Sequence, residues 1–101
     1  MRIVDLLDPK AINLNGSASS KEDALNKMVD LMAASGKIND KQTYANGVFK
    51  REEEGTTGVG EGIAIPHCKS DAVSAPGLAA MVLPAGVEFK ALDGEPVDLI
   101  F

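Results

Sequence analysis

The sequence predicts a single α/β domain, of the α+β type, in which a mixed β-sheet is flanked by helices. Three observations support this class. Residues 20–35 and 40–51 carry helical signals, apolar runs that favour strands follow from residue 63 onward, and turn residues separate those runs. The length of 101 residues suits one domain, so we predict a domain that spans residues 1–101.

The first half of the chain is expected to hold one strand and two helices. Residues 11–15 alternate apolar and polar side chains, which is the period of a half-buried strand. A serine at residues 19–20 can cap a helix start, and Gly36 suits the backbone just after a helix end. A second helix should start near residues 39–40 and run through Arg51.

The second half is expected to hold the rest of the sheet. Residues 52–62, EEEGTTGVGEG, combine three glutamates with four glycines and predict a loop rather than a regular element. Apolar runs then favour strands at 63–66, 78–84 and 97–101, separated by the turn signals APG, PAG and DGEP. The pattern leaves the order of the strands open.

Charge and composition exclude several classes of protein. The net charge is −5 and no basic stripe is present, which argues against a nucleic-acid partner. The apolar stretch IVDLL is interrupted by Asp5 and is too short for a signal peptide or membrane insertion. The single cysteine, Cys68, cannot form an internal disulfide, so we expect a cytoplasmic location.

The glycine-rich loop fits neither common nucleotide motif. Gly55 and Gly60 have P-loop spacing, but Glu61 and Gly62 stand where lysine and a serine or threonine are needed. The dinucleotide fingerprint fails because Ile63 takes the place of its third glycine. Two interpretations stay open: a loop whose N–H groups approach an anion, or a plain connector.

His67, directly after Pro66, is the only histidine in the chain. A neutral imidazole has a free lone pair and can act as a nucleophile, although a hydrogen-bonded structural histidine is the alternative. Metal binding is not expected, because zinc needs three or four spaced ligands and the chain offers only His67 and the adjacent Cys68. Cys68 as a nucleophile is disfavoured, since consecutive residues of an extended segment point to opposite faces; a buried apolar role is the alternative.

Arg51 is the second candidate, just before the acidic run. Its planar guanidinium suits a phosphate group. The alternatives are an ion pair with a glutamate of residues 52–54 or a solvated position on the helix.

Taken together, residues 50–70, KREEEGTTGVGEGIAIPHCKS, resemble the active-site region of the enzyme IIA domains of the fructose and mannitol class in the bacterial phosphotransferase system (PTS). The likeness rests on an Arg-Glu pair, a Thr-Gly-rich loop and then Gly-Ile-Ala-Ile-Pro-His in this order. It extends over the chain through IVDLLDPKAINL, SSKEDALNKMVDLMAASGKI and GVEFKALDGEPVDLIF.

The resemblance implies a phosphoryl carrier. His67 would accept the group from a histidine-containing phosphocarrier protein and pass it to an enzyme IIB domain, for uptake of fructose or a related sugar. Arg51 would offset the phosphoryl charge, and loop N–H groups around Thr57 and Gly58 would add donors. Neither a metal nor a cofactor is implied.

Two other readings stay open. A nitrogen-type regulatory relative would be phosphorylated on the same histidine but act by phosphorylation-dependent protein binding. A structural or binding module would have an inert His67.

The family pattern also includes a further C-terminal segment with helices and a second active-site histidine. This chain stops at VDLIF, inside an expected strand, so we expect a C-terminally truncated domain. An apolar face normally covered by those helices would be exposed and open to association.

Overall fold

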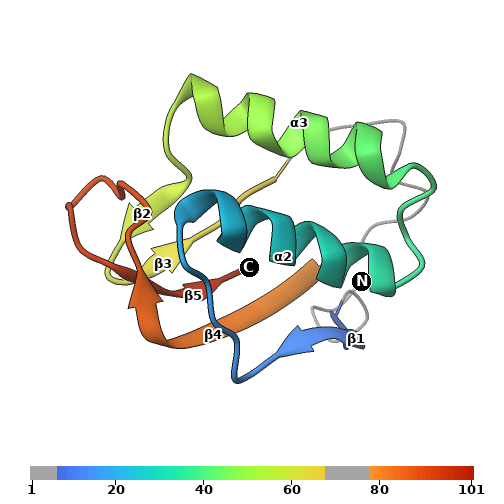
Figure 1. The fold of residues 1–101 in the computed structure, drawn as a ribbon, viewed down its shortest axis with the longest axis horizontal. Coiled ribbons are helices and arrows are strands. Elements are labelled where there is room, and N and C mark those ends of the chain that lie inside the picture. Colours follow the sequence, from blue (N-terminus) through green and yellow to red (C-terminus); the bar gives the residue numbers. More distant parts are fainter. Residues whose placement is uncertain (1–6, 68–77) are drawn as a thin grey trace.

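The structure, a computed structural model, describes residues 7–67 and 78–101. Its elements in chain order are β1 (Leu7–Asn13), α2 (Lys21–Ala34), α3 (Lys41–Glu54), β2 (Gly58–Gly60), β3 (Ile63–Ala64), β4 (Leu78–Val87) and β5 (Val97–Ile100). The strands form one sheet of order β1-β4-β5-β3-β2 (Figure 1). β1 with β4 and β3 with β5 are parallel, whereas β4 with β5 and β2 with β3 are antiparallel. The predicted mixed sheet and α+β class are confirmed.

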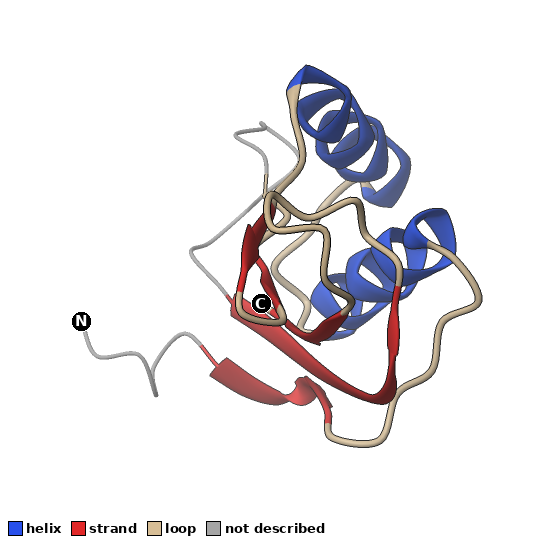
Figure 2. Ribbon diagram, turned by 90° about the vertical axis from the view of Figure 1, so that its left-hand side faces the viewer, coloured by secondary structure: helices blue, strands red, loops and turns tan. Residues whose placement is uncertain are grey.

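Both helices lie on the same side of the sheet (Figure 2). α2 packs directly on β4 and β1, and α3 packs against α2. Each helix has 14 residues. Within 7–67 and 78–101, no helix has the length and apolar character needed to cross a membrane.

The two helices begin where the sequence predicted, because each has a capping side chain. The Ser20 hydroxyl accepts a hydrogen bond from the Asp23 N–H (3.1 Å), and the Asp40 carboxylate accepts one from the Thr43 N–H (3.1 Å). After α2, Gly36 adopts φ +79°, the left-handed conformation that glycine tolerates at a helix end. These boundaries follow from local chemistry alone.

The prediction of a loop over residues 52–62 is wrong in two places. α3 continues through Glu54, and Gly58–Gly60 form β2, which pairs with β3. The turn between β2 and β3 consists of Glu61 (φ +57°) and Gly62 (φ +79°). Positive φ at both central residues is the signature of the tight turn that joins two antiparallel strands.

The PAG signal also does not end a strand. β4 runs on through Val87, and its pairing with β5 shifts register between Val82 and Val87. Such an irregularity accommodates Pro84, which lacks an N–H for the ladder, and Gly86, at φ +72°. The APG signal, at 75–77, lies outside the described residues.

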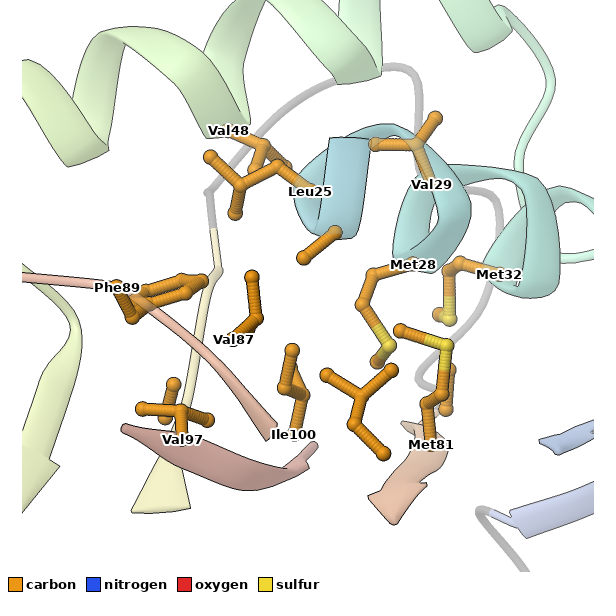
Figure 3. Close-up of a cluster of buried hydrophobic side chains, with 14 of the residues drawn as sticks. Leu25, Met28, Val29, Met32, Val48, Met81, Val87, Phe89, Val97 and Ile100 are labelled. Carbon is orange, nitrogen blue, oxygen red and sulfur yellow. The ribbon is translucent and has the colours of Figure 1, made fainter. Parts of the chain in front are cut away.

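The core lies between α2 and the sheet. In Figure 3, Leu25, Met28 and Met32 of α2 face Met81 of β4 and Ile100 of β5. Val48 is the buried residue of α3. The buried apolar residues are Ala11, Ala24, Leu25, Met28, Val29, Met32, Val48, Ala64, Ala79, Met81, Leu83, Val87, Phe89, Ala91, Val97 and Ile100.

Close packing requires a glycine at one position of residues 52–62. A Cβ on Gly58 would lie 2.8 Å from the Ala91 Cβ and 2.9 Å from the Ala91 Cα. The Leu92 N–H donates to the Gly58 carbonyl (2.9 Å), which holds the two backbones together. Gly58 is therefore a packing requirement of β2.

We expect Gly58→Ala to lower the free energy of unfolding by about 2–3 kcal/mol, because the new Cβ overlaps the Ala91 backbone and side chain. Urea unfolding followed by circular dichroism measures this change. Gly94→Ala is the control: Gly94 has φ +74° but open space around its Cα, so only backbone strain of about 1 kcal/mol is expected. Equal destabilisation by the two substitutions would contradict the packing argument.

Candidate functional site

His67 extends from the segment that follows β3, and its side chain is exposed. Its Nδ1 lies 2.8 Å from the carbonyl oxygen of Ile65. A carbonyl oxygen can only accept a hydrogen bond, so Nδ1 carries the proton. The lone pair of the neutral ring is then on Nε2, which makes Nε2 the nucleophilic atom.

The backbone that leads to His67 is held from two sides. The Ile65 N–H donates to the Thr57 carbonyl (3.0 Å), and the Phe101 N–H donates to the Ala64 carbonyl (3.0 Å). β3 also pairs with β5 in parallel. His67 therefore follows a segment that is fixed by main-chain hydrogen bonds.

Arg51 lies in the last turn of α3, and its Nη1 donates to the carbonyl oxygen of Gly55 (2.9 Å). A cation at this end of a helix is favourable, because the unpaired carbonyl groups carry partial negative charge. Among the described contacts this bond uses one of the five guanidinium N–H donors, so the others can bind an anion.

The same face of α3 meets the segment before His67. Tyr44 and Val48 line an apolar pocket of about 80 Å³ together with Ile65 and Pro66. Residues three or four apart share a helix face, so Arg51 lies one turn beyond Val48 on this face. Arg51 is therefore expected on the helix face that shares this pocket with Ile65 and Pro66.

One alternative for Arg51 was an ion pair with a neighbouring glutamate. Glu52 is not that partner. The Glu52 carboxylate binds the Lys21 ammonium (2.7 Å) and the Thr57 N–H (2.8 Å) and hydroxyl (2.7 Å). Its side chain is only 6% exposed. The sequence analysis included Glu52 in the Arg-Glu pair but gave it no role, and it missed Lys21, because no local spacing links the start of α2 to the end of α3.

Thr57 directly precedes β2, and Gly58 is its first residue. The Thr57 N–H is bound to Glu52, and the Gly58 N–H donates to the Thr56 hydroxyl oxygen (3.1 Å). Thr57 is 3% exposed. In this conformation both N–H groups have acceptors within the protein.

Cys68 lies outside the described residues. Within those residues, no cluster of three or more histidine, cysteine, aspartate or glutamate side chains is placed to hold a metal ion. The described residues thus offer an exposed imidazole at His67, and a guanidinium at Arg51 that is bound to the Gly55 carbonyl.

Comparison with known proteins identifies the family. Residues 5–101 match the family model for the phosphoenolpyruvate-dependent sugar phosphotransferase system, EIIA 2. The PTS system fructose-specific EIIABC component of Bacillus subtilis (strain 168) is 41% identical over 101 residues, which cover all of this chain and 16% of that protein. A nitrogen regulatory protein of Pseudomonas aeruginosa is 40% identical over 101 residues, which cover all of this chain and 66% of that protein.

Solved structures agree with the sequence relatives. The nitrogen regulatory protein IIA-Ntr from Neisseria meningitidis superposes with a TM-score of 0.86 and 31% identity, covering 96% of this chain and 66% of that one. Enzyme IIAMTL from Escherichia coli, solved in complex with phosphorylated enzyme IIBMTL, superposes with a TM-score of 0.82 and 25% identity. That match covers 94% of this chain and 68% of the other. With a family model that matches nearly the whole chain and relatives that share its fold, the chain belongs to the EIIA type 2 family of the sugar phosphotransferase system.

Proposed function

We propose that this chain carries a phosphoryl group on Nε2 of His67. The group would come from a histidine-containing phosphocarrier protein and go to an enzyme IIB domain. Membership of a family of phosphoryl carriers supports this class of activity. The observation that carries the assignment to one atom is the hydrogen bond from Nδ1 to the Ile65 carbonyl, because it leaves the lone pair on the exposed Nε2.

The transfer needs no proton acceptor in this chain. The Nε2 lone pair attacks phosphorus and forms an N–P bond, while the N–P bond of the donor phosphohistidine breaks and its electron pair returns to the donor ring. The proton on Nδ1 stays in place, bound to Ile65. Transfer to the IIB domain would reverse these changes at His67.

Arg51 is the proposed cation. Phosphoryl transfer depends mainly on positioning and on charge stabilisation, and a guanidinium can bind two phosphoryl oxygens at once. Support comes from its position one turn beyond Val48, which lines the same pocket as Ile65 and Pro66. We assign to Arg51 the role of offsetting the phosphoryl charge.

For Thr57 and Gly58 we propose a supporting role. To donate to the phosphoryl group, their N–H groups would have to leave Glu52 and Thr56. Breaking bonds to a buried carboxylate is costly. The loop contributes by holding the segment before His67.

Apolar side chains beside the site are the proposed contact surface for both protein partners. Val59, Ile65 and Leu92 are 54%, 44% and 76% exposed. They lie on adjoining backbone, because the Leu92 N–H binds Gly58 and the Ile65 N–H binds Thr57. Exposed apolar residues next to a reactive group are typical of a transient protein interface.

Fructose or a related sugar is the proposed cargo of the transport system, since the B. subtilis relative is named fructose-specific. The proposed location is the cytoplasm. The regulatory alternative has its own support in the likeness to nitrogen regulatory proteins. There the phosphorylated chain would act by binding a target protein.

We expect one phosphoryl group on the wild-type chain after incubation with enzyme I, the phosphocarrier protein and phosphoenolpyruvate, and none on His67→Ala. Intact-mass spectrometry detects the addition, and loss of the label in acid identifies an N–P bond. Cys68→Ser is the control, because it removes the neighbouring thiol and should leave labelling unchanged. An unlabelled wild-type chain, or a labelled His67→Ala, would refute the carrier assignment.

Replacing Arg51 should slow phosphorylation without preventing folding. We expect Arg51→Gln to lower the rate by about tenfold to a hundredfold, because the cation that offsets the phosphoryl charge is lost. Lys50→Gln removes the same charge from an exposed neighbouring position and should keep the wild-type rate. The initial rate of labelling measures both, and equal rates for the two variants would remove Arg51 from the reaction.

Transfer onward separates the transport role from the regulatory one. We expect the phosphorylated chain to lose its group to a fructose-class enzyme IIB domain, which then gains the same mass. Retention of the group, together with binding of another protein that depends on phosphorylation, would favour regulation.

A further inference from the structure

The least exposed ionised side chain of the site region is one that the proposed transfer does not use. Glu52 is held at both carboxylate oxygens: Oε1 binds Lys21 Nζ (2.7 Å) and the Thr57 N–H (2.8 Å), and Oε2 accepts from the Thr57 hydroxyl (2.7 Å). Burial on its own would raise the pKa of Glu52. The hydrogen bonds from Lys21 and Thr57 outweigh burial and lower the pKa below its usual value. Glu52 is therefore an anion at neutral pH.

Lys21 connects this anion to the opposite side of the loop. Its ammonium lies 4.7 Å from the centre of the Phe89 ring and 3.4 Å from the Thr56 hydroxyl oxygen. That hydroxyl also donates to the Phe89 carbonyl (3.3 Å). The start of α2, the end of α3 and the segment after β4 are thus fixed around residues 56–57.

A continuous series of hydrogen bonds then leads from Glu52 to the imidazole. Glu52 fixes Thr57 through two donors, the Thr57 carbonyl accepts from the Ile65 N–H, and the Ile65 carbonyl accepts from His67 Nδ1. Resting on the proposed function, we infer that Glu52, with Lys21 as its counter-ion, is a positioning residue for His67. It holds the main chain whose carbonyl keeps the proton on Nδ1 and the lone pair on Nε2.

The substitution Glu52→Gln tests this role with little change in volume. A glutamine has one carbonyl oxygen and one NH₂ group, so the Thr57 hydroxyl can no longer donate at the position of Oε2 and has to accept from the NH₂ group instead. The neutral side chain also leaves Lys21 without a counter-ion. We expect the Ile65 carbonyl to become less well placed and the ring proton to be shared with Nε2. Phosphorylation should then slow by roughly tenfold, since small misplacements of a reacting group are costly.

The ring proton can be observed directly. His67 is the only histidine, so a long-range ¹H–¹⁵N spectrum of protein labelled with [¹⁵N]histidine reports its tautomer without assignment. The wild type should show the proton on Nδ1, and Glu52→Gln should show a larger share on Nε2. Glu53→Gln is the matched control, because it removes a charge from the adjacent exposed glutamate and should leave tautomer and rate unchanged.

A second variant and a readout that needs no partner keep the positioning role testable. If Glu52→Gln does not fold by circular dichroism, Thr57→Val removes only the hydroxyl bond and should shift the tautomer in the same direction by less. A folded variant with the wild-type tautomer would overturn the positioning role. The tautomer is read without any partner, so a shift in a chain that is never phosphorylated would support the positioning role and refute only the carrier function.

Discussion

The buried charge of Glu52 is the constraint around which the site is organised. A carboxylate removed from water is costly unless it is paired and hydrogen-bonded, and removing one partner leaves an uncompensated charge. Lys21 and both donors of Thr57 meet that requirement. Their geometry brings together two helix ends and the start of β2, so the electrostatic requirement also determines where the loop lies.

Steric requirements also restrict the residues that follow Thr57. Gly58 packs against Ala91 at a distance that excludes a Cβ, and the turn after β2 needs positive φ at Glu61 and Gly62. The glycines of this segment therefore allow close packing and a tight turn. The N–H groups of Thr57 and Gly58 are already bound, and the Thr57 carbonyl accepts from the Ile65 N–H, so these residues support the segment that leads to His67.

The parts of the fold that could be predicted from the sequence are those that depend on local signals. The helix starts at Ser20 and Asp40 and the end at Gly36 each depend on one side chain or one backbone angle. The end was predicted, and each start was predicted to within one residue. The short strand β2 was missed because its pairing depends on β3 and on Ala91, which no pattern in residues 52–62 records. Strand order is a property of the whole chain and was open for the same reason.

The candidate site, too, could be predicted from the sequence only in part. His67 and Arg51 were candidates from residue type, because few side chains offer a neutral nucleophile or a phosphate-binding fork, and the family resemblance assigned their proposed roles. The partners of Glu52 were not predicted, since Lys21 and Thr57 meet it only in the folded chain. Chemical groups can therefore be read from a sequence more easily than the contacts that orient them.

The partner of Nδ1 has a consequence for the chemistry of a carrier. A carboxylate hydrogen-bonded to a histidine raises the basicity of the ring and stabilises its charged form. The Ile65 carbonyl is neutral, so it fixes the tautomer and the ring orientation without placing a charge beside the ring. If Nε2 carries the proposed phosphoryl group, this contact fixes the direction in which the group points. A backbone acceptor thus orients the ring through the fold itself, without a second carboxylate that would need its own counter-ion.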